Sequence, residues 1–519
     1  MKLIKAMATV AGLTGLSRIA GFGRDILTAG ILGAGPIADA FFVALKLPNL
    51  FRRVTAEGAF TVAFVPLYSQ TLEKEGEATA SRFAGNAFTI MLWTLLVFTC
   101  LAMMAMPWII NLIAPGFSDD PLRYPMSIEL SRITFPYLLL MSLTALMGGI
   151  LNAHDKFAPF AAAPILFNCS LIVALLCSNV FESAGHAMAY GVFGAGILQF
   201  LLLLFFIKKY SYGFRIQKPR YSPRIKKLFK NMVPTTISAG VMQINLFADM
   251  IIASLLPAGA ISYLYYADRL NQLPLGMVGI AVGTALLPML SKAIAAGDSK
   301  ESSDLYNRAM EVCLLLALPA ATGLFVLSQP IISTLFQHGE FTPEDARMTA
   351  RVLTAYAVGM PAYIFVKVYA TAYWARQDTT SPMWASVIAT VFNIALSLYL
   401  VLLTPMGVEG IALATALAGW LQIVILGRGL RAQEDTRWDA RFKTAALKIF
   451  AASLAMAAAL YMAMPYTTSF FLEDAALIQQ ITGLVILIGG GASVYAAVIL
   501  GTGAVRINYL KKILKKARK

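Results

Sequence analysis

Apolar stretches about 20 residues long recur from one end of this 519-residue chain to the other. A helix of about that length, rising 1.5 Å per residue, crosses the roughly 30 Å hydrocarbon core of a bilayer. Hydrophobic residues make up 58% of the chain and charged residues 13%, against roughly 25% charged residues in soluble proteins. A water-soluble fold could not cover this much apolar surface with a charged exterior. The chain is therefore predicted to be an integral membrane protein and not a soluble enzyme with a membrane tail.

Fourteen stretches satisfy the length criterion, with boundaries placed at polar residues or at Pro and Gly clusters. They cover residues 8–32, 37–68, 84–113, 128–151, 160–179, 187–207, 231–256, 262–291, 309–335, 346–374, 382–403, 408–427, 444–464 and 480–504. The fold class predicted from them is an all-α polytopic membrane protein with 14 transmembrane helices. The first stretch is interpreted as a retained helix and not as a signal peptide, because Arg18, Arg24 and Asp25 interrupt its apolar run.

The basic residues fall mainly on alternate loops, and 30 of the 42 lysines and arginines belong to one side. The positive-inside rule then places both termini in the cytoplasm, in agreement with an even number of helices. The net charge of +15 is explained by loops that face anionic lipid, so no nucleic-acid partner is predicted. The four cysteines lie in apolar runs and predict no disulfide.

The chain also contains an internal repeat with an offset near 223 residues. Pro66 corresponds to Pro288, Pro136 to Pro361, Asn168 to Asn393 and Gln199 to Gln422. Six helices per copy is an even number, so both copies cross in the same direction and a pseudo-two-fold axis along the membrane normal relates them. The predicted domains are an N-lobe at 1–207, a basic cytoplasmic linker at 208–230, a C-lobe at 231–427, and helices 13 and 14 with a basic tail at 428–519.

Charged residues concentrate in the first two predicted helices, where each costs roughly 2.5–3.5 kcal/mol at membrane depth. They are Arg18, Arg24 and Asp25 in the first helix and Asp39, Lys46, Arg52, Arg53 and Glu57 in the second. Asp39, Lys46 and Arg53 are spaced by seven and share one helix face. Five positive and three negative charges favour an anion in a water-filled cavity, and the excess of arginine suits phosphate oxygens. The alternative is a set of internal ion pairs that only hold helices together.

The second half carries fewer polar groups. The segment Tyr265-Tyr-Ala-Asp-Arg269 places Asp268 and Arg269 near the start of a helix, with Gln272 one turn later. Asp249, Asn393, Ser397 and Thr415 supply oxygen atoms for a sodium ion or a proton relay, or else form interhelical hydrogen bonds. His154, His186 and His338 lie in or beside three different loops, so no metal site is expected. The sequence has no Walker A motif or Rossmann fingerprint, so ATP hydrolysis is not predicted.

Two six-helix lobes that cross the membrane in the same direction, with a positively charged cavity between them, are typical of an alternating-access transporter. The charged residues of this predicted cavity lie in four motifs: Arg18-Ile-Ala-Gly-Phe-Gly-Arg-Asp25, Ala38-Asp-Ala-Phe-Phe-Val-Ala-Leu-Lys-Leu-Pro-Asn-Leu-Phe-Arg-Arg53, Ala56-Glu-Gly-Ala-Phe60 and Tyr265-Tyr-Ala-Asp-Arg269. Over essentially the whole chain these resemble the MurJ (MviN) family of the multidrug, oligosaccharidyl-lipid and polysaccharide exporter superfamily.

The resemblance implies a flippase of the bacterial cytoplasmic (inner) membrane, without enzymatic activity. Its cargo would be lipid II, the undecaprenyl-pyrophosphate-linked disaccharide-pentapeptide precursor of peptidoglycan. Cavity residues of the family match Arg18, Arg24, Asp39, Arg52, Arg53 and Arg269, of which Arg18, Arg24 and Arg269 resemble pyrophosphate contacts. Asp25, Lys46, Glu57 and Asp268 support that cavity, as does Gln272, where several relatives carry an acid. Helices 13 and 14 resemble the family's lipid-tail groove. We expect a monomer that contacts membrane lipids and the wall-synthesis machinery.

Other functions stay open at this stage. A flippase for another polyprenyl-linked glycan would use the same arginines, whereas a multidrug exporter would prefer an acidic, aromatic cavity. A membrane-bound glycosyl transferase would show metal-binding acids in a cytoplasmic loop, and the acids here are scattered among basic residues. No cofactor is expected. The energy source is Na+ or H+ coupling or, as a hypothesis, the membrane potential acting on a cavity that is positive when empty.

Overall fold

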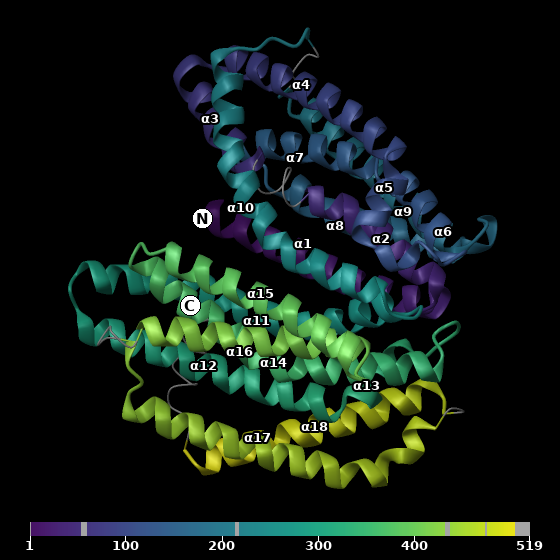
Figure 1. Cartoon of the computed structure of the whole chain (residues 1–519). Coiled ribbons are helices and arrows are strands. Elements are labelled where there is room, and N and C mark those ends of the chain that lie inside the picture. The colour runs from purple at the N-terminus through teal and green to yellow at the C-terminus, as the bar shows by residue number, and fades with distance from the viewer. Residues whose placement is uncertain (1, 53–59, 213–216, 431–435, 473–474, 504–519) are drawn as a thin grey trace. The chain divides into compact units, whose positions relative to one another are not determined.

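The computed structural model describes residues 2–52, 60–212, 217–430, 436–472 and 475–503. These residues form a series of helices joined by short turns (Figure 1). They divide into two compact units, the first comprising residues 1–262 and 338–341 and the second residues 263–337 and 342–519.

The first unit contains ten α-helices among the described residues, and the first turn of an eleventh. They are α1 (Lys2–Leu32), α2 (Pro36–Phe51), α3 (Thr61–Glu75), α4 (Glu77–Met104), α5 (Met106–Ile113), α6 (Arg123–Thr134), α7 (Tyr137–Ala153), α8 (Ala158–Leu176), α9 (Ala184–Lys209) and α10 (Pro223–Ser254), with short 3-10 turns at Pro115–Phe117 and Ser178–Val180. Its apolar core lies among α3, α4 and α7, where the ring of Phe64 stacks on those of Phe60, Tyr68 and Phe83.

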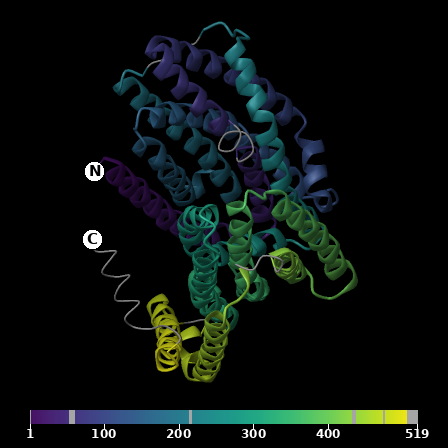
Figure 2. The same ribbon diagram turned by 90° about the vertical axis from the view of Figure 1, so that its left-hand side faces the viewer.

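The second unit begins within α11, which runs from Ala260 to Ala295. It continues with α12 (Ser299–Val326), α13 (Ser328–Phe336), α14 (Pro343–Ala375), α15 (Thr380–Leu403), α16 (Val408–Leu430), α17 (Ala440–Thr467) and α18 (Leu477–Gly501). The helices α17 and α18 lie side by side (Figure 2), and α17 packs along α12. The hydroxyl of Tyr495 in α18 donates to the carbonyl oxygen of Leu315 in α12, at 2.8 Å.

Ten helical segments in the described ranges are long and apolar enough to cross a membrane. Each coincides with one of the stretches marked from sequence, so the prediction of an all-helical, multi-pass membrane fold is confirmed. The count of fourteen stays a prediction.

Helix boundaries recur along the chain in the way that the proposed repeat requires. Both α4 and α12 have 28 residues, and they begin 222 residues apart, at Glu77 and Ser299. The turns after α7 and α14 have the same form, because Asp155 (φ 59°) and Gln377 (φ 63°) are both left-handed. A glutamine of α9, Gln199, donates to the carbonyl oxygen of Ala163 in α8, and Gln422 of α16 donates to Ser386 in α15. The two-lobe arrangement and the axis between the lobes stay predictions.

Residues 217–224, which lead into α10, contact α3 and α4. The side chain of Asn86 accepts from the backbone N–H of Arg220 (2.9 Å) and donates to its carbonyl oxygen (2.6 Å). The amide of Gln217 donates to the carbonyl oxygen of Arg82, at 2.5 Å, and Arg224 forms an ion pair with Glu75. We call residues 217–224 the strap. Although its charge resembles that of a free linker, its backbone is bonded to the first unit.

Residues 338–341 belong to the first unit because they lie against the end of α1. The backbone N–H of Glu340 donates to the carbonyl oxygen of Gly30, at 2.9 Å. Gly339 has φ +59°, and a Cβ atom there would lie 2.1 Å from that same oxygen. This contact therefore requires glycine both for its backbone conformation and for its lack of a side chain.

Replacing Gly339 by Ala should lower the apparent melting temperature of the purified protein. The Gly407→Ala variant is a matched control, because Gly407 has φ +59° but open space around its Cβ position. The control measures only the cost of placing alanine at a left-handed φ, which is about 1–2 kcal/mol. Gly339→Ala adds the clash with the oxygen of Gly30, so it should be clearly the less stable variant. Equal melting temperatures would show that the 338–341 contact adapts without loss.

Candidate functional site

Arg24 is the most deeply buried arginine of α1, with 8% of its surface exposed. Its Nε donates to Oδ1 of Asp25 at 3.0 Å, and its Nη1 donates to Oδ1 of Asn168 in α8 at 3.0 Å. Asn168 in turn donates to the backbone oxygen of Ser17, at 2.9 Å. The helices approach closely at Gly21, where an added Cβ would lie 3.4 Å from Asn168. An uncharged amide on α8 thus holds the guanidinium in place.

The pair of Arg24 and Asp25 satisfies the rule that a charge buried in a protein carries a partner. Asp25 is 4% exposed, so removing either residue would leave the other charge buried. The ring of Phe167 lies 5.8 Å from the Arg24 guanidinium and shields it on another side. Sequence analysis singled out both charged residues but gave no sign of Asn168 as their partner.

Asp39 is fully buried in the first turn of α2. Its Oδ2 accepts from the backbone N–H of Gly259 at 2.7 Å, and its Oδ1 accepts from the backbone N–H and the hydroxyl of Ser262 at 2.9 and 2.6 Å. Because α11 begins at Ala260, the carboxylate caps the start of that helix from a distant part of the sequence. We call this contact the Asp39 cap.

Arg123 lies beside the Asp39 cap and is not among the site residues predicted from the sequence. Its Nη1 lies 4.0 Å from Asp39 and donates to the backbone oxygen of Leu256 at 3.0 Å. Its Nε donates to Asp120 at 2.6 Å. Desolvation raises the pKa of Asp120, but hydrogen bonds from the backbone and side chain of Arg123 outweigh it and hold this pKa below its ordinary value. The two acids that precede it by four and three positions, Asp119 and Asp120, are the sequence signal that could have marked this arginine as part of an ion pair.

The other cationic residues predicted in the first two helices have mixed environments. Arg18 is exposed on α1, and Lys46 and Arg52 are half-buried on α2. The Nε of Arg52 donates to Oδ1 of Asn49, at 3.3 Å. Arg53 and Glu57 lie outside the described residues.

In the second unit, Arg269 and Asp268 are half-buried in the first turns of α11. The guanidinium of Arg269 lies 4.5 Å from the ring centroid of Tyr265, one turn earlier. Gln272 donates a hydrogen bond to Asp268. The motif thus forms one helical face on which an aromatic ring and an amide hold the two charged groups.

Three of the four candidate cation ligands meet in one cluster. The hydroxyl of Ser397 donates to Oδ1 of Asn393 at 3.0 Å, and Nδ2 of Asn393 donates to Thr415 at 3.4 Å. These bonds join α15 to α16, as the alternative of interhelical hydrogen bonding requires. Asp249 belongs to α10 of the other unit, where Asn245 donates to it at 3.3 Å.

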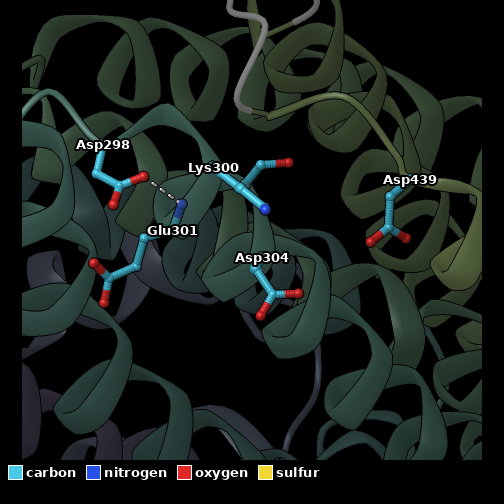
Figure 3. Close-up of a pocket in the computed structure, with 6 residues that line it drawn as sticks. Asp298, Lys300, Glu301, Asp304 and Asp439 are labelled. Carbon is cyan, nitrogen blue, oxygen red and sulfur yellow. Dashed lines mark hydrogen bonds between the residues drawn. The ribbon is translucent and has the colours of Figure 1, made fainter.

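A cavity of about 680 Å³ opens at the start of α12 (Figure 3). It is lined by Asp298, Lys300, Glu301, Ser303, Asp304 and Asp439. Four carboxylates against one ammonium group disfavour a phosphate ligand. Asp298 caps α12 through the backbone N–H of Glu301, at 2.9 Å. Beside the cavity, Arg308 pairs with Asp304, Glu311 and Asp439 and ties α12 to the start of α17. We therefore assign this acidic cavity a structural role.

Comparison with known proteins gives a consistent result. A family model described as "Lipid II flippase MurJ" matches residues 28–480. The chain is 37% identical to "Probable lipid II flippase MurJ" of Rhizobium meliloti (strain 1021), over 99% of this chain and 97% of that protein. It is 35% identical to "Lipid II flippase MurJ" of Burkholderia cenocepacia, over 83% of this chain and 84% of that protein.

Solved structures extend the comparison to the fold. "Lipid II flippase MurJ, inward closed conformation" superposes with a TM-score of 0.76 at 29% identity, covering 95% of this chain and 99% of that one. An inward-facing multidrug transporter of the MOP superfamily superposes with a TM-score of 0.68 at 12% identity, which shows a shared fold alone. The family match spans most of the chain, and full-length relatives exceed 30% identity. The chain belongs to the lipid II flippase MurJ family.

Proposed function

We propose that this protein is a flippase that moves lipid II from the inner to the outer leaflet of the bacterial cytoplasmic membrane. Flippases move a molecule without changing it, so the protein is a transporter and not an enzyme. The observation that carries the proposal is the match to lipid II flippases along nearly the whole chain. A buried arginine in α1 adds chemistry suited to a pyrophosphate.

The proposed architecture has 14 membrane-spanning helices, with lobes at 1–207 and 231–427 related by an axis along the membrane normal. The recurring helix boundaries and glutamine contacts support it. Both termini lie in the cytoplasm, because the basic loops lie on that side. The chain acts as a monomer that contacts membrane lipids and the wall-synthesis machinery.

In this mechanism Arg18, Arg24 and Arg269 hold the pyrophosphate, and Arg52 and Arg53 extend the positive surface. Transfer of a pyrophosphate through hydrocarbon would cost far more than its transfer between arginine side chains that replace its water. The ion pair with Asp25 keeps the Arg24 side chain extended before substrate arrives. Substrate oxygens then compete with Asp25 for the same donors.

In the proposed transport cycle, the hydrogen bonds of the Asp39 cap are formed in one state and broken in the other. It joins α2 of the first proposed lobe to the start of α11, which belongs to the second. Alternating access requires such bonds to form when one face is closed and to break when it opens. Asp39 therefore acts as a positioning residue for one face and not as a direct substrate contact.

The prenyl chain of the substrate stays in lipid and lies along α17 and α18. These two helices fall outside the repeat and expose large apolar side chains, including Leu447, Leu454, Ile478 and Val485. The ion pair of Arg308 with Asp439 ties the start of α17 to α12, and Tyr495 ties α18 to α12, so both helices stay attached to the second unit.

The energy source is proposed to be the membrane potential, at about 2.3 kcal/mol per charge per 100 mV. A gradient of Na+ or H+ acting at Asp249, Asn393, Ser397 and Thr415 is the alternative. If the potential is collapsed in vesicles while both gradients are clamped, flipping should slow; an unchanged rate would favour the ion gradients.

The experiment that tests the proposed function is depletion of the protein from growing cells, followed by labelling of lipid II at the outer leaflet. Total lipid II should rise while its outer-leaflet fraction falls, and re-expression should restore both. A fall in total lipid II would instead indicate a glycosyl transferase. An unchanged distribution would indicate an exporter of other compounds or a flippase for another glycan.

A further inference from the structure

Three side chains with metal-binding atoms converge where α6 meets α9, away from the residues assigned to the substrate. Glu129 lies on α6, Glu182 precedes α9, and His186 lies in the first turn of α9. Their ligand atoms all lie within 4.8 Å of one another. The Nε2 atom of His186 is 3.3 Å from an oxygen of Glu129 and 3.9 Å from an oxygen of Glu182.

The imidazole of His186 is buried and fixed in orientation. Only 7% of its side-chain surface is exposed. Its Nδ1 lies 2.9 Å from Oγ of Ser183, which also accepts the backbone N–H of His186 and so caps α9. Its Nε2 is buried and has no hydrogen-bond partner among the residues that the structure describes. This nitrogen therefore faces two carboxylates without a hydrogen bond to either of them.

We propose that Glu129, Glu182 and His186 bind one Zn2+ ion. Zinc ligands lie at about 2.0–2.2 Å from the metal in a tetrahedron, which places neighbouring ligand atoms roughly 3.3–3.6 Å apart. The two distances from Nε2 are close to this range. Both glutamate side chains are substantially exposed, at 57% and 86%, so they can rotate onto the ion. Two carboxylates balance its charge, water fills the fourth position, and Ser183 orients the histidine.

Sequence analysis expected no metal because the three histidines lie in separate loops. That argument treats histidines as partners of one another, whereas a single histidine with two glutamates is a sufficient ligand set. Glu129 and Glu182 are 53 positions apart and their pairing depends on the packing of α6 against α9.

The bound ion would cross-link α6 to α9 close to the start of α2. At Gly185 an added Cβ would lie 2.7 Å from Ile37 and 3.1 Å from Leu130, so the three helices leave little space there. Figure 1 shows α2, α6 and α9 close together, in agreement with their contacts. The same helix, α6, begins with Arg123, which lies beside the Asp39 cap. By the predicted topology this end faces away from the cytoplasm, where zinc is accessible without entering the cell.

The test uses the full chain purified in detergent through a tag without histidine, stripped with a chelator and titrated with Zn2+ alone. Calorimetry and metal analysis after dialysis should give one Zn2+ per chain. His186→Gln should abolish this binding, and Glu182→Gln should weaken it more than tenfold, since even outer-shell changes cost 10–100-fold. Glu73→Gln, an exposed glutamate on α3, is the matched control and should bind as the parent does.

Retention of one Zn2+ by both His186→Gln and Glu182→Gln would overturn the proposal, as would a parent chain that binds none. Because Glu182 is 86% exposed, its variant should fold as the parent does, which the melting temperature without zinc verifies. Binding is measured without any flipping assay, so its failure leaves the proposed transport function unaffected.

Discussion

A strain that depends on the Arg24→Ala variant should fail to grow, because flipping should fall below the rate that wall synthesis needs. The substitution removes a buried guanidinium, 8% exposed, and breaks its ion pair with the buried carboxylate of Asp25. Breaking a buried pair in this way costs about 3–5 kcal/mol. Arg24→Lys should also fail, because an ammonium group cannot donate to Asp25, Asn168 and a pyrophosphate in the same geometry. Complementation at native protein abundance is the measurement.

The double variant Arg24→Ala with Asp25→Ala separates a structural role from a transport role. Removing both charges also removes the buried carboxylate of Asp25, so the melting temperature should recover toward that of the parent. Growth should nevertheless fail, because the pyrophosphate loses one of the three arginines proposed to hold it, and Arg18 and Arg269 do not replace that guanidinium. Growth supported by the double variant would show that Arg24 serves only to neutralise Asp25. Arg347→Ala is the control, since that exposed arginine forms a surface ion pair with Glu344 on the same helix, which contributes little to stability.

The Asp39→Asn variant should lose both stability and function, with an effect second only to that of Arg24. Each Asp39 oxygen accepts hydrogen bonds, and the fixed donors come from the backbone of Gly259 and Ser262. An amide would place an NH2 group against one of these donors and would remove the attraction to Arg123. Loss of hydrogen bonds to a charged group costs about 1.5–3 kcal/mol each. The melting temperature of the purified variant should fall by several degrees.

Asp119→Asn is the matched control for this prediction, because Asp119 is an exposed carboxylate one position before Asp120, the ion-pair partner of Arg123. It should melt with the parent. Ser254, at the end of α10, is buried and accepts a hydrogen bond from the backbone N–H of Gly116. In a Ser254→Cys background, the reaction rate of that cysteine with a thiol reagent measures how often the region around the Asp39 cap opens. Asp39→Asn should increase that rate. Equal melting temperatures and equal labelling would refute the role of the cap.

The sequence located most of the helices because membrane thickness imposes a length on each of them. It also identified Arg24 and Asp25, since a charge inside an apolar helix is costly wherever the helix packs. The partners of these charges are a different matter. Asn168 lies 144 positions from Arg24, and Gly259 lies 220 positions from Asp39. Their pairing follows from how helices pack, which no local pattern encodes.

The spacing of Asp39 and Lys46 shows the same limit in another form. Both residues share a helix face, yet Asp39 is fully buried while Lys46 is only half-buried. Asp39 lies in the first turn of α2, where it contacts the start of α11. Lys46 lies two turns further along α2. A helical face defines a direction but not a depth.

The strap has a practical consequence for engineering this protein. Its backbone is bonded to α4 through Asn86, so a loop inserted between residues 217 and 224 would disrupt structure, despite the hydrophilic composition of this region. Fluorescent reporters and new chain ends belong elsewhere.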